Sequence, residues 1–191
     1  MNTCLIVIDA QESFRHRPFF TERDMPAWLA AQNALIEGAR AVGMPMARVF
    51  HADGPEQASN PFALASGHVR PIEGLADFDA DTTVYKRRHS ALVGTGLDVW
   101  LTQRGIGRLI ISGIRTEQCC ETTARHASDL GWSIDFVADA TLTFDMQQPD
   151  GAPLSAEAIK ARTATVLSGR FVTLCTAEQA LARATDAAGN H

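Results

Sequence analysis

The chain has no long hydrophobic run and only four cysteines, and we expect it to have no secretory leader. No stretch approaches the roughly 20 apolar residues that a membrane-spanning helix needs. The N-terminus carries no basic region followed by an apolar region and a cleavage site. Four cysteines in such a chain predict reduced thiols rather than a disulfide framework. We therefore expect a cytoplasmic protein without a membrane partner.

An excess of positive charge is also missing. The sequence has 17 lysines and arginines against 22 acidic residues, for a net charge of −5. This balance argues against a surface that binds nucleic acid irrespective of its sequence, so a small molecule is the expected partner. Gly94-Thr95-Gly96 lacks the full dinucleotide fingerprint and the lysine of a phosphate-binding loop, and we expect no nucleotide cofactor.

What is present predicts one α/β domain. A chain of 191 residues with 46% hydrophobic content can bury one sizeable core. Apolar strand-like runs alternate with helical patterns, which is typical of βαβ units and a parallel sheet. We expect a three-layer α/β/α domain over residues 1–185, with a mostly parallel sheet of about six strands, and a disordered tail over 186–191. The expected strands lie near 4–9, 46–51, 82–85, 108–112, 133–137 and 171–174, and the expected helices near 26–42, 95–104, 117–131, 154–168 and 176–185.

The segment from 52 to 81 has little periodicity and carries prolines at 55, 61 and 71. A loop of this length inside a compact domain usually has a function of its own. We expect it to form a loop or lid that shapes the mouth of a substrate pocket.

The run Gly113–Arg125, directly after the apolar Leu109–Ile111, predicts a thiol at the start of a helix. The amide dipoles there are expected to lower a thiol pKa and favour the reactive thiolate. Helical spacing aligns Cys120 with small apolar residues that pack on the sheet, whereas Cys119 faces the other way. Cys119 is the predicted nucleophile, and the alternative is a buried small hydrophobic residue.

Two further strand ends carry charge. Asp9 follows the apolar Leu5–Ile8, and Lys86 follows the β-rich stretch from 82 to 85. Residues just past the carboxyl ends of parallel strands line the ligand crevice, so Asp9, Lys86 and Cys119 are expected to converge there. The alternatives are a turn-capping role for Asp9 and a solvated position for Lys86. Because both side chains are expected to serve the site rather than the core, Asp9→Asn and Lys86→Met should abolish turnover and leave the fold intact.

Three motif blocks carry a family resemblance. Asp9-Ala10-Gln11 with Phe14, Lys86 through Ala91, and Gly113 through Arg125 resemble, in order and approximate spacing, the isochorismatase-like cysteine hydrolase superfamily. That superfamily includes nicotinamidases and N-carbamoylsarcosine amidohydrolase. The resemblance covers the chain from Leu5 to about Thr176 and implies an isochorismatase-like, Rossmann-like fold, often assembled as a homodimer or homotetramer.

The resemblance implies a hydrolase that cleaves a carbon–nitrogen bond of a small amide, carbamoyl or ureido substrate through a thioester on Cys119. It implies Asp9 as the base, Lys86 as the residue that orients it, a cis peptide between Ile114 and Arg115, and an oxyanion hole made by the amides of Arg115 and Cys119. One alternative is an isochorismatase-type vinyl-ether hydrolase, whose members commonly lack the nucleophilic cysteine. Another is a thiol redox or ligand-sensing module that uses Cys119 and Cys120.

Candidate substrate-binding residues are Gln11, Phe14 and Arg115. Arg115 stands where many relatives have a small residue, and its guanidinium either enters the pocket to bind a carboxylate or turns outward. His51, Asp53 and His68 offer possible metal ligands, but their spacing does not match the nicotinamidase pattern. We expect no metal and no cofactor.

Overall fold

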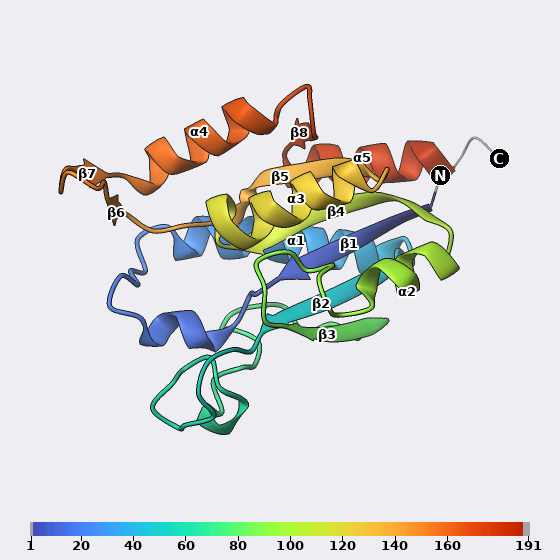
Figure 1. The fold of residues 1–191 in the computed structure, drawn as a ribbon. Coiled ribbons are helices and arrows are strands. Elements are labelled where there is room, and N and C mark those ends of the chain that lie inside the picture. The colour runs from blue at the N-terminus through green and yellow to red at the C-terminus, as the bar shows by residue number, and fades with distance from the viewer. Residues whose placement is uncertain (1, 189–191) are drawn as a thin grey trace.

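A six-stranded sheet forms the centre of the molecule, and all five of its strand pairings are parallel (Figure 1). The computed structural model describes residues 2–188. The strands, in the spatial order β3-β2-β1-β4-β5-β8, are β1 (Asn2–Ile8), β2 (Met46–His51), β3 (Thr82–Lys86), β4 (Ile106–Ile114), β5 (Ser133–Leu142) and β8 (Thr173–Cys175). The predicted fold class is confirmed, and β5 extends beyond its expected end because, past a register shift, Thr141 and Leu142 pair with Gly113 and Ile114.

Helices cover both faces of the sheet and complete the three layers (Figure 1). Helices α1 (Met25–Ala41) and α5 (Ala177–Ala188) pack on one face, and α2 (Leu97–Gln103) and α3 (Glu121–Asp129) pack on the other. The remaining elements are η1 (Glu12–His16), η2 (Leu64–Ser66), η3 (Thr116–Cys120), α4 (Ala156–Leu167) and the short antiparallel pair β6 (Met146–Gln147) and β7 (Pro153–Leu154). Because α5 continues to Ala188, residues 186–188 of the expected tail are helical, and the rest of that tail lies outside the described residues.

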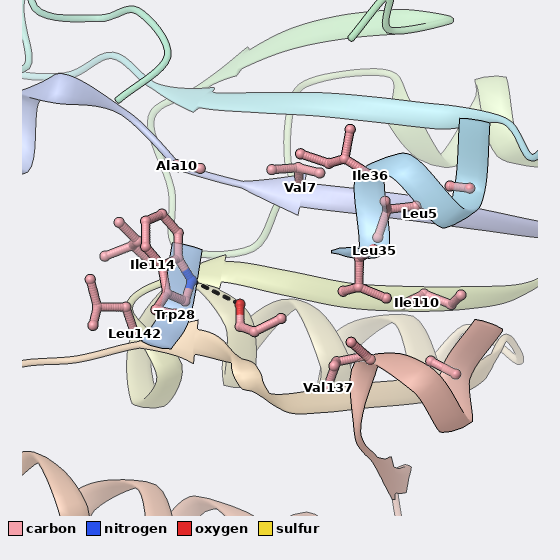
Figure 2. Close-up of a cluster of buried hydrophobic side chains, with 14 of the residues drawn as sticks. Leu5, Val7, Ala10, Trp28, Leu35, Ile36, Ile110, Ile114, Val137 and Leu142 are labelled. Atoms are coloured by element: carbon pink, nitrogen blue, oxygen red, sulfur yellow. Dashed lines mark hydrogen bonds between the residues drawn. The ribbon is translucent and has the colours of Figure 1, made fainter. Parts of the chain in front are cut away.

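Side chains alternate along β1 and so contribute to the hydrophobic clusters on both faces of the sheet. Leu5 and Val7 point into the cluster with α1 and α5, while Ile6 and Ile8 point into the cluster with α2 and α3. All of them are buried, as expected for a central parallel strand covered on both faces. In the first cluster, the indole N–H of Trp28 donates a hydrogen bond of 3.0 Å to the carbonyl of Ala140, so its one polar group is satisfied (Figure 2).

The strand order reverses between β1 and β4. From β1 the chain proceeds outward through β2 and β3, and from β4 it proceeds the other way through β5 and β8. Ligand crevices of open parallel sheets form at such a point, beyond the carboxyl ends of the strands. Gly113 permits the close approach here, because a Cβ at its position would clash with the carbonyl oxygen of Ile8.

The long loop between β2 and β3 is fastened to the segment that follows β1. Pro71 forms an isolated β-bridge with Gln11, and the N–H of Ile72 donates to the carbonyl of Ala10 at 3.0 Å. The loop is thereby fastened, at Pro71 and Ile72, to the segment that follows β1 at the carboxyl end of the sheet. Within the part of the chain that the structure describes, no helix is long and apolar enough to cross a membrane.

Candidate active site

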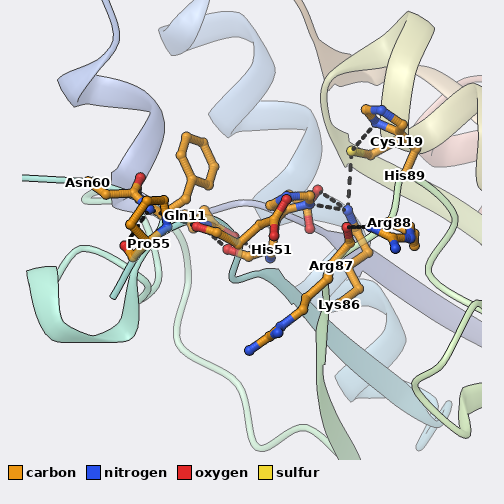
Figure 3. Close-up of polar contacts among 12 residues, drawn as sticks. Gln11, His51, Pro55, Asn60, Lys86, Arg87, Arg88, His89 and Cys119 are labelled. Atoms are coloured by element: carbon orange, nitrogen blue, oxygen red, sulfur yellow. Dashed lines mark hydrogen bonds and ion pairs between the residues drawn. The ribbon is translucent and has the colours of Figure 1, made fainter. Parts of the chain in front are cut away.

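Asp9, Lys86 and Cys119 meet at the switch point, although they come from three separate elements. The Lys86 Nζ lies 2.7 Å from the Asp9 Oδ2 and donates a hydrogen bond of 3.2 Å to the Cys119 Sγ (Figure 3). The side chains of Asp9 and Lys86 are both 0% exposed. The ammonium and the carboxylate therefore form a buried ion pair directly beside a thiol.

The backbone at Asp9 adopts an uncommon conformation. Its φ of +50° lies in the left-handed region, which aspartate tolerates better than most residues. The N–H of Asp9 donates to the carbonyl of Val49 at 2.8 Å, and its own carbonyl accepts from the N–H of Gln11 at 2.8 Å. The first bond ties Asp9 to β2 and the second closes a tight turn after β1, so the backbone that carries the carboxylate is fixed on both sides.

The two neighbouring cysteines have different surroundings, as the helical spacing predicts. Both lie on η3, a π-helical turn that precedes α3, where an ordinary α-helical start was expected. Cys119 lines a cavity, whereas Cys120 is 0% exposed and packs in the core with Ala124 and Ala127. Only Cys119 of this pair faces the space that a substrate can occupy.

The expected lowering of the Cys119 pKa is wrong. Burial raises the pKa of the Cys119 thiol to about 12, and the negative charge of Asp9 adds to the shift while Lys86 opposes it. Loss of hydration disfavours the thiolate more than the nearby ammonium favours it. Cys119 therefore rests as a protonated thiol at neutral pH and needs a base, and an oxygen of Asp9 lies within 4.8 Å of its sulfur.

The cavity over Cys119 has a volume of about 460 Å³. Phe14 forms part of its wall and meets Phe62 edge-to-face, with ring centroids 5.2 Å apart. The predicted position of Phe14 beside the substrate space therefore agrees with the structure. The other lining residues are Asp9, Arg17, Phe19, His51, Asp53, Gly54, Pro55, Asn60, His89, Arg115 and Gln118.

A second cavity, of about 610 Å³, lies at the opposite end of the sheet. It is bounded by Asn2, Pro45 and Ile106, near the amino ends of the strands, and among residues 2–188 its lining contains no cysteine, histidine, aspartate or glutamate. Although this cavity is larger than the cavity over Cys119, the described residues that line it offer no side chain for acid, base or nucleophilic chemistry.

Gln11 does not line the cavity over Cys119, contrary to its predicted role. Its amide Nε2 donates to the carbonyl of His51 at 3.0 Å and to the Ser13 hydroxyl at 2.8 Å, and its Oε1 accepts from the N–H of His51 at 2.8 Å. Both ends of the side chain are thus used to tie the end of β2 to the segment after β1. The sequence placed Gln11 near the site but could not show which backbone groups it would bind.

Arg115 points inward, which decides between the two orientations left open by the sequence. The residue is 6% exposed and lines the cavity. Its Nη2 lies 3.0 Å from Glu117 Oε1, and its guanidinium carbon lies 4.9 Å from the centre of the Phe19 ring. The peptide bond between Ile114 and Arg115 is cis.

Two histidines at the site were not predicted as active-site residues. The Nδ1 of His51 lies 3.0 Å from the Lys86 Nζ, and the Nδ1 of His89 lies 4.0 Å from the Cys119 Sγ (Figure 3). From the sequence, His51 is expected only as a possible metal ligand. Its place as the last residue of β2 was a usable signal, because β2 pairs in parallel with β3 and brings His51 into register with Lys86.

The side chains of the site do not fit a metal ion. His51 and Asp53 approach to 3.9 Å, but His68 stacks on the ring of His16 instead of joining them. Among the described residues, one group of three possible ligands lies close together, and it consists of Asp9, His51 and Cys119. The Lys86 ammonium contacts each of these side chains, so a metal cation would have to displace a positive charge that already binds there.

Comparisons with known proteins agree with the fold and with the family resemblance. The family model of the isochorismatase domain matches residues 3–170. YrdC, an uncharacterised isochorismatase family protein of Bacillus subtilis, is 26% identical over 180 residues, which is 92% of either chain. Nicotinamidase 3 of Arabidopsis thaliana is 42% identical over 77 residues (40% of this chain and 38% of that one), and the ureidoacrylate amidohydrolase RutB of Stutzerimonas stutzeri is 34% identical over 87 residues (46% and 35%).

Solved structures give the same result over the whole domain. A putative isochorismatase from Burkholderia xenovorans superimposes with a TM-score of 0.86 at 28% identity, covering 96% of this chain and 88% of the other. A putative hydrolase of the isochorismatase family from Chromobacterium violaceum has a TM-score of 0.84 at 26% identity, covering 97% and 94%. The chain belongs to the isochorismatase family.

Proposed function

We propose that the protein is a hydrolase that cleaves a carbon–nitrogen bond of a small amide, carbamoyl or ureido compound through a thioester on Cys119. One observation carries this proposal: the Lys86 ammonium contacts both the Asp9 carboxylate and the Cys119 sulfur at the floor of a cavity. The matching amidohydrolases among the relatives, a nicotinamidase and a ureidoacrylate amidohydrolase, support the same class of reaction.

The first half of the reaction uses the thiol and its base. Asp9 takes the proton of Cys119 as the sulfur attacks the substrate carbonyl, so a carbon–sulfur bond forms and the carbonyl oxygen becomes an oxyanion. The backbone amides of Arg115 and Cys119 stabilise that oxyanion. When the intermediate collapses, the carbon–nitrogen bond breaks and the amine leaves with the proton held by Asp9.

The second half regenerates the thiol. Asp9 removes a proton from water, the resulting hydroxide attacks the thioester, and the carbon–sulfur bond breaks. The acid product leaves and the sulfur regains its proton from Asp9. Lys86 keeps the Asp9 carboxylate in place and compensates the negative charge that passes between carboxylate and sulfur.

The wall of the cavity favours a substrate that carries a negative group. Arg115 and Arg17 both line it, and both guanidinium groups lie over the ring of Phe19. Arginine binds carboxylates through paired N–H donors. Glu117 occupies one edge of the Arg115 guanidinium, so we assign to the rest of that group the role of orienting a substrate carboxylate.

The redox alternative has less support. Cys120 is completely buried and burial raises its pKa well above the ordinary value, so it is a poor partner for thiol exchange.

Ammonia release from nicotinamide, N-carbamoyl amino acids and ureido acids tests the proposal. We expect release from at least one of these classes, together with a covalent adduct on Cys119 after rapid quenching. Cys119→Ala is the matched control and should release none. Equal release by this variant and the parent would overturn the thioester mechanism.

A further inference from the structure

Lys86 makes three polar side-chain contacts through its ammonium group, an ion pair with Asp9 and hydrogen bonds with His51 and Cys119. The Nζ lies 2.7 Å from Asp9 Oδ2, 3.0 Å from His51 Nδ1 and 3.2 Å from Cys119 Sγ (Figure 3). A lysine ammonium has three donors and no acceptor, so each partner must accept. Because the Lys86 side chain is 0% exposed, these three side chains take the place of its hydration.

This geometry determines the state of the His51 ring. If Nδ1 accepts from Lys86, the neutral ring carries its proton on Nε2. A protonated ring would bring two cations to within 3.0 Å of each other. Burial and the Lys86 charge lower the pKa of His51, which agrees with the neutral form.

The backbone of His51 is also fixed by hydrogen bonds. Its N–H and carbonyl bind both ends of the Gln11 amide, and its position in β2 is paired with Lys86 in β3. The Nδ1 acceptor is therefore carried by a fixed part of the sheet rather than by a mobile loop.

We propose that His51 is a positioning residue, which accepts the third N–H of Lys86 through Nδ1 and so holds the ammonium between Asp9 and Cys119. The proposal adds to the thioester chemistry proposed above and uses the same site. His51 is not the base of the reaction, because the lone pair of Nδ1 is engaged by Lys86 and Nε2 carries the proton. Without this acceptor, the ammonium is free to turn away from the sulfur.

Asparagine and glutamine variants at position 51 can show which nitrogen of the His51 ring is the one that Lys86 needs. An asparagine places its carbonyl oxygen near the position of Nδ1, whereas a glutamine reaches the position of Nε2. We expect His51→Leu and His51→Gln to lower kcat on the order of 10²-fold, the loss caused by a catalytic group misplaced by about 1 Å. KM should change little, and His51→Asn should regain most of the parental kcat. A purely structural role would give equal losses for Asn and Gln, in step with their melting temperatures.

Two measurements on the parent protein do not depend on substrate turnover. In ¹⁵N NMR, the His51 ring, assigned through the missing signal of His51→Asn, should show an unprotonated Nδ1 and a protonated Nε2 at pH 7. The rate at which iodoacetamide alkylates Cys119 should change in His51→Gln and be restored in His51→Asn. A proton on Nδ1, or restoration by Gln instead of Asn, would overturn the proposal. An inactive parent with the expected NMR state would contradict only the proposed amide hydrolysis.

Discussion

The buried ion pair between Asp9 and Lys86 yields a quantitative prediction about stability as well as activity. Both side chains are 0% exposed and their charged atoms are 2.7 Å apart. Removing one member of a buried pair leaves the other charge without compensation, which costs about 3–5 kcal/mol. Asp9→Asn and Lys86→Met should each lower the free energy of unfolding by that amount. For a chain of this size, the melting temperature would fall by about 6–20 °C.

This prediction differs from the expectation from the sequence that both variants would leave the fold intact. That expectation assigned both side chains to the site rather than to the core, whereas Lys86 ranks among the largest fully buried side chains of the described residues. Both variants should still lose on the order of 10²-fold or more in turnover, because the proton acceptor or its partner is gone.

A double-mutant cycle measures the coupling. The variant that combines Asp9→Asn with Lys86→Met leaves no buried charge unpaired, so its loss should be smaller than the sum of the single losses by about 1–3 kcal/mol. Urea unfolding at pH 7 gives the four free energies. Turnover should not recover in the double variant, which separates stability from catalysis.

The exposed pair of Arg23 and Asp145, 2.9 Å apart with side chains 52% and 53% exposed, offers a matched control. A double-mutant cycle on Arg23 and Asp145 should show much weaker coupling, since water and salt screen exposed charges. If the single variants at positions 9 and 86 unfolded within about 1 kcal/mol of the parent and their effects simply added, the buried pair would not exist in solution.

Four further predictions concern the thiols, the pocket and metals. Cys120→Ala should keep turnover, and a substrate-like electrophile should label Cys119 in mass spectrometry; a label confined to Cys120 would contradict the assignment. Because burial raises the pKa of Cys119 from 9.0 to about 12, its alkylation should accelerate through the alkaline range, and the thiol's contribution to stability should be full below pH 9 and lost as the pH rises to about 12. A plateau of alkylation already reached at neutral pH would show a lower pKa. Arg115→Gln should raise KM for substrates with a carboxylate and leave neutral amides unaffected; an equal rise for both would place the guanidinium away from the substrate charge. Prolonged chelation should leave turnover unchanged, and activity that is lost and then restored by zinc or iron would require a metal site.

Local sequence patterns were sufficient for the architecture and for placing three side chains of the site at one edge of the sheet, whereas the family resemblance supplied their expected catalytic roles. A strand buried on both faces is a continuous apolar run, and an amphipathic helix repeats with its own period, so both are visible in short windows. A charged residue directly after an apolar run marks a strand end, as at Asp9, and so does one that follows a β-rich stretch, as at Lys86. Helical spacing also indicated that Cys119 faces the crevice and that Cys120 packs on the sheet.

Tertiary structure decided the properties that depend on distant neighbours. The pKa of Cys119 rises because residues from several elements exclude water from the sulfur, and no local pattern measures that burial. Gln11 binds the backbone of His51, 40 residues away, and His51 reaches Lys86 only because β2 and β3 pair in one register. Arg115 turns inward because Phe19 and Glu117 receive its guanidinium there. The sequence by itself determined which chemical groups stand at the strand ends, because the periodicity that marks a strand is local. The fold determined the protonation and the partners of those groups, because hydration and hydrogen bonding depend on which segments the fold brings together.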